Sequence, residues 1–356
     1  MPTCTAASMR CRWALPPAPH RCSATSWPNA FLASRRIGDH MDFELNDDER
    51  SLQEGIRSFL TGRCPIEVVR ANEETGGALD RTLWRELADV GVFSLRTDGF
   101  GMTESVLAFE ELGRSLVAGP LVASHLAASV VAGAGDGSRI VGLLEPAEPV
   151  TMVEHLASLD DLIVLRNDGI FVVEPSGVIG VLAERPLDAL TPITRLDDVP
   201  DGQRIGDAAM ALQWRRDGMV LTAGLQLGLC LASIDLAKTY AMQREQFGRP
   251  IGSFQAVKHM LADMLTKAEV TRAAVYAAAV NIDGRGDSSD LMQTARMAKL
   301  LAGDSALFCG KTCIQVHGGM GFTWEVDAQR YWKRACVLDT HFGNSDEHAA
   351  AFSAAL

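Results

Sequence analysis

Two segments in the last third of the chain carry residue types that can bind an anionic nucleotide. The first runs from Tyr240 to Gln255 and reads Tyr-Ala-Met-Gln-Arg-Glu-Gln-Phe-Gly-Arg-Pro-Ile-Gly-Ser-Phe-Gln. Arg244 can hold a phosphate through the forked, charge-assisted hydrogen bonds of a guanidinium. Gln246 and Gln255 can hydrogen-bond a base or a sugar. The alternative is that these are surface polar residues in a turn between two helices.

The second segment, Cys313–Phe322, reads Cys-Ile-Gln-Val-His-Gly-Gly-Met-Gly-Phe and contains Gly318, Gly319 and Gly321. Glycine tolerates a positive φ and lets a ligand approach the main chain closely. One glycine would be enough to end the preceding helix. A cluster of three therefore favours contact with a ligand, with a helix C-cap as the alternative.

Helices must position both segments, because apolar residues recur at three- and four-residue spacing on either side of the middle of the chain. Asn46 or Asp47 can cap the first helix, whose apolar face holds Leu52, Ile56, Phe59 and Leu60, and Asp80 can cap the second, which Gly91 ends. Further helices are predicted over Glu104–Leu116, Pro120–Val131, Met219–Arg244, from a cap at Ser253 onward, over Asp287–Val316 and over Asp327–Leu338.

The pattern changes between about residues 141 and 200, where prolines are frequent. Leu162–Leu165 is a short strand, Asn167–Gly169 a hairpin turn, and Ile170–Val173 the returning strand. Because strands and helices are segregated along the chain, the fold is mainly α with a small β domain and is not doubly wound. We expect an N-terminal helical domain over 41–140, a shortened middle β domain over 141–204, and a C-terminal helical bundle over 205–356.

The composition excludes several classes of function. The 356 residues carry a net charge of −12, which disfavours nucleic acid and anionic membranes as partners. No apolar run approaches the length of a membrane span, and the eight cysteines show no spacing typical of a metal site. Free thiols indicate a reducing cytoplasm.

Residues 1–40 are rich in Arg, Pro and Ser; we interpret them as a disordered or mis-annotated extension before Met41, with a transit peptide as the alternative.

Taken together, the two polar segments resemble the C-terminal helical domain of the acyl-CoA dehydrogenase family. The resemblance extends over Gly224–Met264, Thr312–Glu325 and Leu83–Leu121, and Phe109–Leu116 is similar to the family's N-terminal helical segment. It covers essentially Met41 onward. It implies an N-terminal helical domain, a middle β domain and a C-terminal four-helix bundle.

The resemblance also implies a chemistry and a cofactor. These enzymes desaturate an acyl-CoA thioester at its α and β carbons: a carboxylate removes the α-proton, and the β-hydride goes to FAD. Their arginine-containing turn and Gln-x-x-Gly-Gly segment reach across a subunit interface to the neighbour's FAD. Carried over to this chain, the FAD-contacting residues are Arg244, Gln246, Phe247, Gln255, Gln315, Val316, His317, Gly318 and Gly319.

The chain departs from the family where its own active site should lie. Phe342 stands where many members have the catalytic glutamate, and Asn344 where they have the following threonine. Gly218 stands where other members place a glutamate on the long helix. The stretch Arg215–Met219 scrambles the family's usual charges, and Leu144–Pro149 is only a remnant of its Thr-Glu-Pro turn.

These losses favour one function over two others. We expect the base-lacking partner subunit of a heterotetrameric acyl-CoA dehydrogenase, of the type associated with bulky steroid side-chain substrates. It would share FAD with a second, base-containing subunit that acts on an acyl-CoA. The first alternative is a self-sufficient homomeric enzyme with a divergent base such as Asp217, or less readily His341. The second is a flavin-free scaffold.

Overall fold

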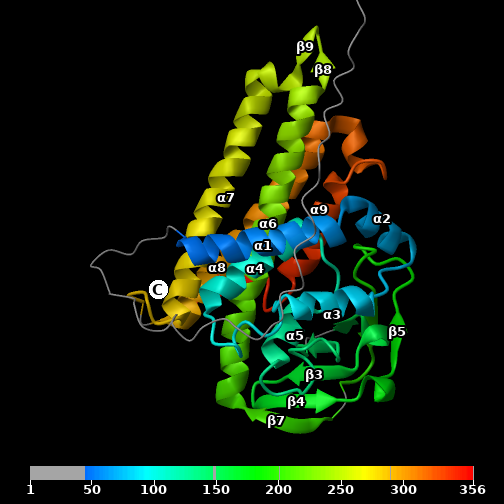
Figure 1. Cartoon of the computed structure of the whole chain (residues 1–356), viewed down its shortest axis with the longest axis vertical. Helices are drawn as coiled ribbons and strands as arrows, with labels where there is room; N and C mark the ends of the chain where they lie inside the picture. The colour runs from blue at the N-terminus through cyan, green and yellow to red at the C-terminus, as the bar shows by residue number, and fades with distance from the viewer. Residues whose placement is uncertain (1–44, 147–149, 200, 289, 356) are drawn as a thin grey trace, which may run out of the picture. The chain divides into compact units, whose positions relative to one another are not determined.

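The computed structural model describes residues 45–146, 150–199, 201–288 and 290–355. The expected extension over residues 1–40 lies outside this part of the chain, as do three residues of the Thr-Glu-Pro remnant, Ala147–Pro149. Figure 1 shows the described elements coloured from blue to red along the sequence.

The first part of the chain is helical, as the apolar spacing predicts. Asn46 caps α1 with a capping box in which its side chain accepts from Glu49, and Asp80 accepts from the amide of Thr82 to cap α3. The sequence analysis missed one short helix, α2, between these two. The helices are α1 (Asp47–Arg63), α2 (Ile66–Glu74), α3 (Arg81–Asp89), α4 (Met102–Arg114) and α5 (Leu121–Ala127).

The middle of the chain forms two small sheets. One has the strand order β1-β3-β4-β7 and the other β2-β6-β5. The predicted turn at Asn167–Gly169 joins the antiparallel pair β3 and β4, as expected, but the sequence analysis did not resolve the other five strands. The strands are β1 (Val141–Leu144), β2 (Thr151–Glu154), β3 (Asp161–Leu165), β4 (Gly169–Val173), β5 (Gly180–Leu182), β6 (Ile193–Leu196) and β7 (Gln203–Asp207).

The last part of the chain is again helical. The long helix α6 begins at Ala208, eleven residues before the predicted start, because Asp207 caps it. Ser253 does not cap α7; it ends a 3₁₀ turn, and the N-cap residue is Phe254. The helices are α6 (Ala208–Gln243), α7 (Gln255–Ile282), α8 (Leu291–His317), α9 (Ala328–Asp339) and α10 (Ser345–Ala355), the last of which was not predicted.

Helix α6 is the centre of the core and packs against α4 and α8. A side chain at Gly113 of α4 would overlap the carbonyl group of Leu225, and one at Gly228 of α6 would overlap that of Glu110. The two glycines therefore let the backbones of α4 and α6 touch. This contact places α4 and the start of α5 beside the C-terminal helices.

Helix α6 also corrects the expectation that no apolar run reaches membrane length. One window of this helix is long and apolar enough to cross a membrane, with a mean hydropathy of 1.7, and 78% of it is buried inside the protein. Burial against neighbouring helices accounts for that apolar character. In the described part of the chain, no three His, Cys, Asp or Glu side chains gather to hold a metal ion.

Candidate functional site

The first polar segment forms a hairpin that projects beyond the ends of α6 and α7 (Figure 1). Strand β8 (Glu245–Gln246) pairs with β9 (Arg249–Pro250), and the turn between them holds Phe247 at a positive φ of 55°. The Phe247 side chain is 91% exposed, which is unusual for a large apolar residue. The hairpin thus exposes the aromatic ring of Phe247 beyond the ends of α6 and α7, where a ligand or a second protein chain could contact it.

The second polar segment begins where α8 ends, at His317. Gly318 has a φ of 62°, and no atom lies within 4 Å of where a side chain would start at Gly318 or Gly319. A ligand can therefore reach this backbone. The ring of His317 stacks on Tyr240 of α6 at 4.2 Å between centroids. This stacking joins the end of α8 to the last turn of α6, just before the hairpin.

Most of the residues carried over from the resemblance are available at the surface. Arg244 is exposed and has no ion-pair partner among the described residues, so its charge is free to meet an anion. Val316 and His317 are buried and support the segment from inside. The exposed ones are Arg244, Gln246, Phe247, Gln255, Gln315, Gly318 and Gly319.

Gly218 and Phe342, the two positions that the resemblance matches to the family's glutamate, lie against each other. A side chain added at Gly218 would start within 2.7 Å of three ring atoms of Phe342. The Phe342 side chain is buried, and its backbone has a φ of 54°, which is uncommon for a bulky residue. An apolar ring thus packs on a bare stretch of α6 at these two positions.

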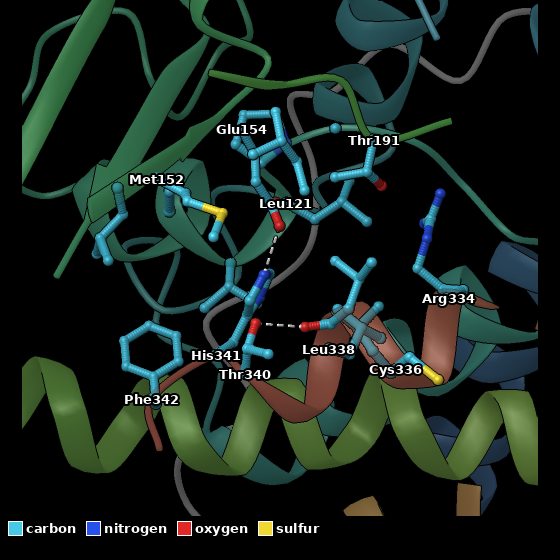
Figure 2. A pocket seen from close by; sticks show the side chains of 18 of the residues that line it. Leu121, Met152, Glu154, Thr191, Arg334, Cys336, Leu338, Thr340, His341 and Phe342 are labelled. Atoms are coloured by element: carbon cyan, nitrogen blue, oxygen red, sulfur yellow. Dashed lines mark hydrogen bonds and ion pairs between the residues drawn. The ribbon is translucent and has the colours of Figure 1, made fainter. Parts of the chain in front are cut away.

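A cavity of about 430 Å³ lies next to this contact. Its walls come from α4, α5, β1, β2, the start of β6, α6 and α9. Figure 2 shows part of this lining, including Glu154, Arg334 and His341. Most of the lining is apolar. The charged or polar side chains that line it are Glu145, Glu154, Thr191, Arg334, Cys336, Thr340 and His341.

His341 and Glu154 form a hydrogen-bonded pair on the wall of the cavity. The distance from Nε2 of His341 to Oε1 of Glu154 is 2.7 Å, and each side chain is about a quarter exposed. Burial opposes ionisation of Glu154, but the charge and hydrogen bond of His341 outweigh it and hold the carboxyl pKa to about 2. A carboxylate that orients an imidazole is an arrangement used in acid–base catalysis and in ligand binding.

The other charged residues near the cavity are paired in the same way. Arg334 donates to Asp188 and to the carbonyl of Val117. Arg215 donates to Glu145 at 2.9 Å; burial raises the pKa of Glu145, and the guanidinium of Arg215 partly opposes that shift. The charges that look scrambled in the sequence therefore have defined partners.

Asp217, the weak candidate base, lies elsewhere. It is 4% exposed, accepts two hydrogen bonds from the guanidinium of Arg216 at 2.6 and 2.8 Å, and is not among the residues that line the cavity. His341, the weaker candidate in the sequence analysis, does line it. Geometry therefore favours His341 over Asp217 as the titratable group that a ligand in this cavity would meet.

The sequence analysis missed Glu154, Asp188 and Arg334. Glu154 contacts a residue 187 positions away, and Asp188 contacts one 146 positions away. No local spacing could have signalled these pairs. Glu145 was visible only as part of the Thr-Glu-Pro remnant.

Comparison with known proteins places this architecture in one class. The ChsE4–ChsE5 complex from Mycobacterium tuberculosis superimposes with a TM-score of 0.74 at 22% identity, covering 88% of this chain and 98% of that one. A variant of the Tcur3481–Tcur3483 steroid ACAD gives a TM-score of 0.74 at 23% identity, covering 86% and 97%. The fold is that of the acyl-CoA dehydrogenases.

Sequence comparison identifies the family. Residues 46–137 match the acyl-CoA dehydrogenase N-terminal domain and residues 207–356 the acyl-CoA dehydrogenase C-terminal domain. The acyl-CoA dehydrogenase IpdE2 of Mycolicibacterium smegmatis is 30% identical over 82% of this chain and 93% of its own length. The chain belongs to the acyl-CoA dehydrogenase family, whose members are FAD-dependent oxidoreductases acting on CH–CH bonds.

Proposed function

We propose that this chain is the partner subunit of a heteromeric acyl-CoA dehydrogenase, which contributes FAD contacts and supplies no catalytic base. The packing of Phe342 against Gly218 carries the proposal. These are the two positions expected to hold the glutamate, and neither side chain can accept a proton. The base that removes the α-proton of the acyl-CoA would come from the second subunit.

The FAD contacts would lie at the exposed end of α6, α7 and α8. Arg244 offers an unpaired cation within the described chain, Gln246 and Gln255 offer amides, and Gly318 and Gly319 offer open backbone. These groups suit the anionic pyrophosphate and the polar adenosine of FAD. Bound FAD would accept the hydride of the reaction. Phe247, Gln315, Val316 and His317 complete the proposed set, which reaches across the interface to the second subunit's flavin.

The same end of the molecule suits a protein interface. Four large apolar side chains there are more than half exposed, Met242, Phe247, Phe322 and Trp324. Exposed aromatic and methionine side chains are typical of contact surfaces. Two structural relatives are themselves named as pairs of chains, ChsE4–ChsE5 and Tcur3481–Tcur3483, which supports a paired assembly here. The five described cysteines are free, which suits a cytoplasmic complex.

Flavin absorbance tests the proposal directly. The chain is purified alone. It is then co-purified with an acyl-CoA dehydrogenase subunit that is encoded by a neighbouring gene and carries the family's catalytic glutamate. We expect yellow protein and dehydrogenation of acyl-CoA only from the complex. An active, flavin-containing protein made of this chain alone would contradict the shared site. A complex that forms without flavin would favour the scaffold alternative.

Three substitutions sharpen the test. Arg244→Gln should lower flavin content and raise the FAD dissociation constant of the complex about tenfold, because a charge-assisted phosphate contact is lost. Lys238→Gln removes one positive charge from an exposed position of α6, the helix that ends just before Arg244, and serves as the control; it should leave flavin content unchanged. Asp217→Asn should also leave turnover unchanged, since Asp217 is not the base in this proposal.

A further inference from the structure

Three helices meet around one buried histidine near the end of the chain. Helix α10 packs against α8, and the turn 340–344 joins α10 to the end of α9. His348 lies on the inner face of α10 and is 4% exposed. Histidine is the side chain whose ordinary pKa lets its charge change between pH 5 and 8. The surroundings of His348 therefore decide how α10 responds to pH.

The ring of His348 contacts the turn that precedes α10. It hydrogen-bonds to the backbone of Phe342, and a side chain added at Gly343 would start 3.0 and 3.1 Å from two atoms of the ring. Phe342 and Gly343 have positive φ angles of 54° and 90°, and a bulky residue keeps such a conformation only where its surroundings hold it. His348 thus supports the turn that places Phe342 against Gly218.

The buried ring has no acceptor for a second proton. The hydrogen bond to Phe342 favours the protonated ring, so the ring donates this bond and the backbone carbonyl accepts it. The other ring nitrogen, Nε2, is buried and has no hydrogen-bond partner among the described residues. A proton added at Nε2 would therefore place a charge in the interior without a partner.

The charged side chains around His348 add to this cost. Lys299 and Arg296 of α8 are cations that oppose its protonation, whereas Glu347 on α10 itself favours it. At the end of α9, Oδ1 of Asp339 lies 3.9 Å from Nζ of Lys299 and offsets part of that charge. Burial first, and then the two cations, lower the pKa of His348 below its ordinary value of 6.5.

Helix α10 depends on its contact with α8. It has 11 residues, fewer than an isolated helix needs to be stable in water. Its first turn is capped, because Asn344 and Glu347 accept hydrogen bonds from each other's backbone amides at 2.9 and 3.0 Å. A cap alone does not keep so short a segment helical. When α10 leaves α8 it therefore loses its helical hydrogen bonds, which hydrogen exchange can detect.

We propose that His348 is a pH-sensitive switch that controls the docking of α10. The neutral ring holds α10 on α8 and supports the backbone of Phe342. Below about pH 6.5 the released segment binds a proton that the docked ring resists, so acidification shifts the equilibrium toward release. Release of α10 frees the turn 340–344 and with it the contact between Phe342 and Gly218. The switch requires neither FAD nor a second subunit.

Hydrogen exchange of the full chain at pH 7.0 and pH 5.5 tests the switch, after correction for the intrinsic effect of pH on amide exchange. If the docked ring stays neutral, the ordinary pKa of the released ring predicts that the opening of α10 increases up to about eightfold. Helix α3 contains no histidine and serves as the internal reference. Its corrected protection should not change.

Two variants assign the effect to His348, and a third is the control. His348→Asn keeps an amide that can donate to Phe342 but cannot take up a proton, and it should remove the increase. Lys299→Met removes one opposing cation, so the docked ring accepts a proton more readily and the increase should become smaller. His259→Asn changes an exposed histidine of α7 and should leave the increase as it is.

Three results would overturn the proposal. Equal corrected protection of α10 at the two pH values would mean that its docking does not sense pH in this range. Equal loss of protection in α3 and α10 would indicate unfolding of the whole protein. An increase that persists in His348→Asn would assign the effect to another group. If His348→Asn has already lost the protection of α10 at pH 7.0, Lys299→Met decides, because an unchanged increase there contradicts the switch.

Discussion

At the scale of single residues, the contact between Phe342 and Gly218 makes a prediction about packing. Gly218→Ala would push its new methyl group into the Phe342 ring, a clash of the kind that costs about 1–3 kcal/mol. In a Phe342→Ala background the clash disappears. The same change should then stabilise α6 by up to about 1 kcal/mol through helix propensity. Urea denaturation of the four proteins measures this coupling.

Gly55 is the matched control, because it also lies inside a helix but has no atom within 4 Å of a new side chain. Gly55→Ala should stabilise the protein by the same amount whether residue 342 is Phe or Ala. If Gly218→Ala behaved like Gly55→Ala in both backgrounds, Phe342 would not occupy the space beside Gly218.

Single residues also show what local sequence can and cannot reveal. The caps at Asn46 and Asp80 and the turn at Asn167–Gly169 were predicted correctly, because each depends on neighbours within a few positions. The partner of His341 was not predicted, since Glu154 is 187 positions away. The absence of a carboxylate at 342 and 218 was visible from the resemblance, but the contact between these two positions required the fold.

At the scale of elements, α4 depends on a cap from a distant helix. Gly101 precedes α4 and has no side chain to cap it. Instead the carboxylate of Asp283, at the end of α7, accepts from the amides of Met102 at 2.6 Å and Thr103 at 3.0 Å. It also accepts from the Thr103 hydroxyl. One carboxylate thus satisfies the start of α4 and joins it to α7.

Asp283→Ala should therefore destabilise the protein by about 2 kcal/mol, at the upper end of helix-cap substitutions. Asp80→Ala removes a cap with a single exposed bond to Thr82 and should cost about 1 kcal/mol or less. Urea denaturation gives both values, and hydrogen exchange should show faster exchange at the start of α4 in Asp283→Ala only. Equal losses in the two variants would mean that the three-bond cap adds nothing.

Contacts between elements far apart in the sequence explain most of the other features of the fold that were not predicted. The first eleven residues of α6 were not assigned to the helix, because Arg215, Arg216 and Asp217 interrupt the apolar pattern. In the structure Arg215 reaches Glu145 and Arg216 pairs with Asp217, so the charges are accommodated without ending the helix. The short strands β1, β2 and β5–β7 have no turn signal comparable to Asn167–Gly169.

At the scale of the whole molecule, the C-terminal helices enclose a charge that links stability to pH. The Lys299 side chain is fully buried in α8, and its Nζ donates to the carbonyl of Asp339 at 3.0 Å, where α9 ends. Burial lowers the pKa of Lys299 from 10.5 to about 8, although the charge of Asp339 opposes the shift. Folding therefore favours the neutral amine.

The sign of the effect follows from proton binding. Between pH 8 and 10.5 the unfolded chain holds the Lys299 proton more tightly than the folded chain, so raising the pH through this range favours folding. A pKa difference of this size corresponds to about 3 kcal/mol. Raised pKa values of buried groups such as Tyr276 and Cys313 act in the opposite direction at high pH, so a comparison with a variant is needed to isolate Lys299.

Lys299→Met provides that comparison, because it keeps a long side chain and removes the titrating group. The difference in unfolding free energy between the unmodified protein and Lys299→Met should shift by about 3 kcal/mol in favour of the unmodified protein between pH 7.5 and pH 10.5. Urea denaturation at the two pH values measures this difference, and the contributions of the tyrosines and cysteines cancel. A difference that stays constant with pH would mean that water reaches Lys299 and that the C-terminal helices do not enclose it.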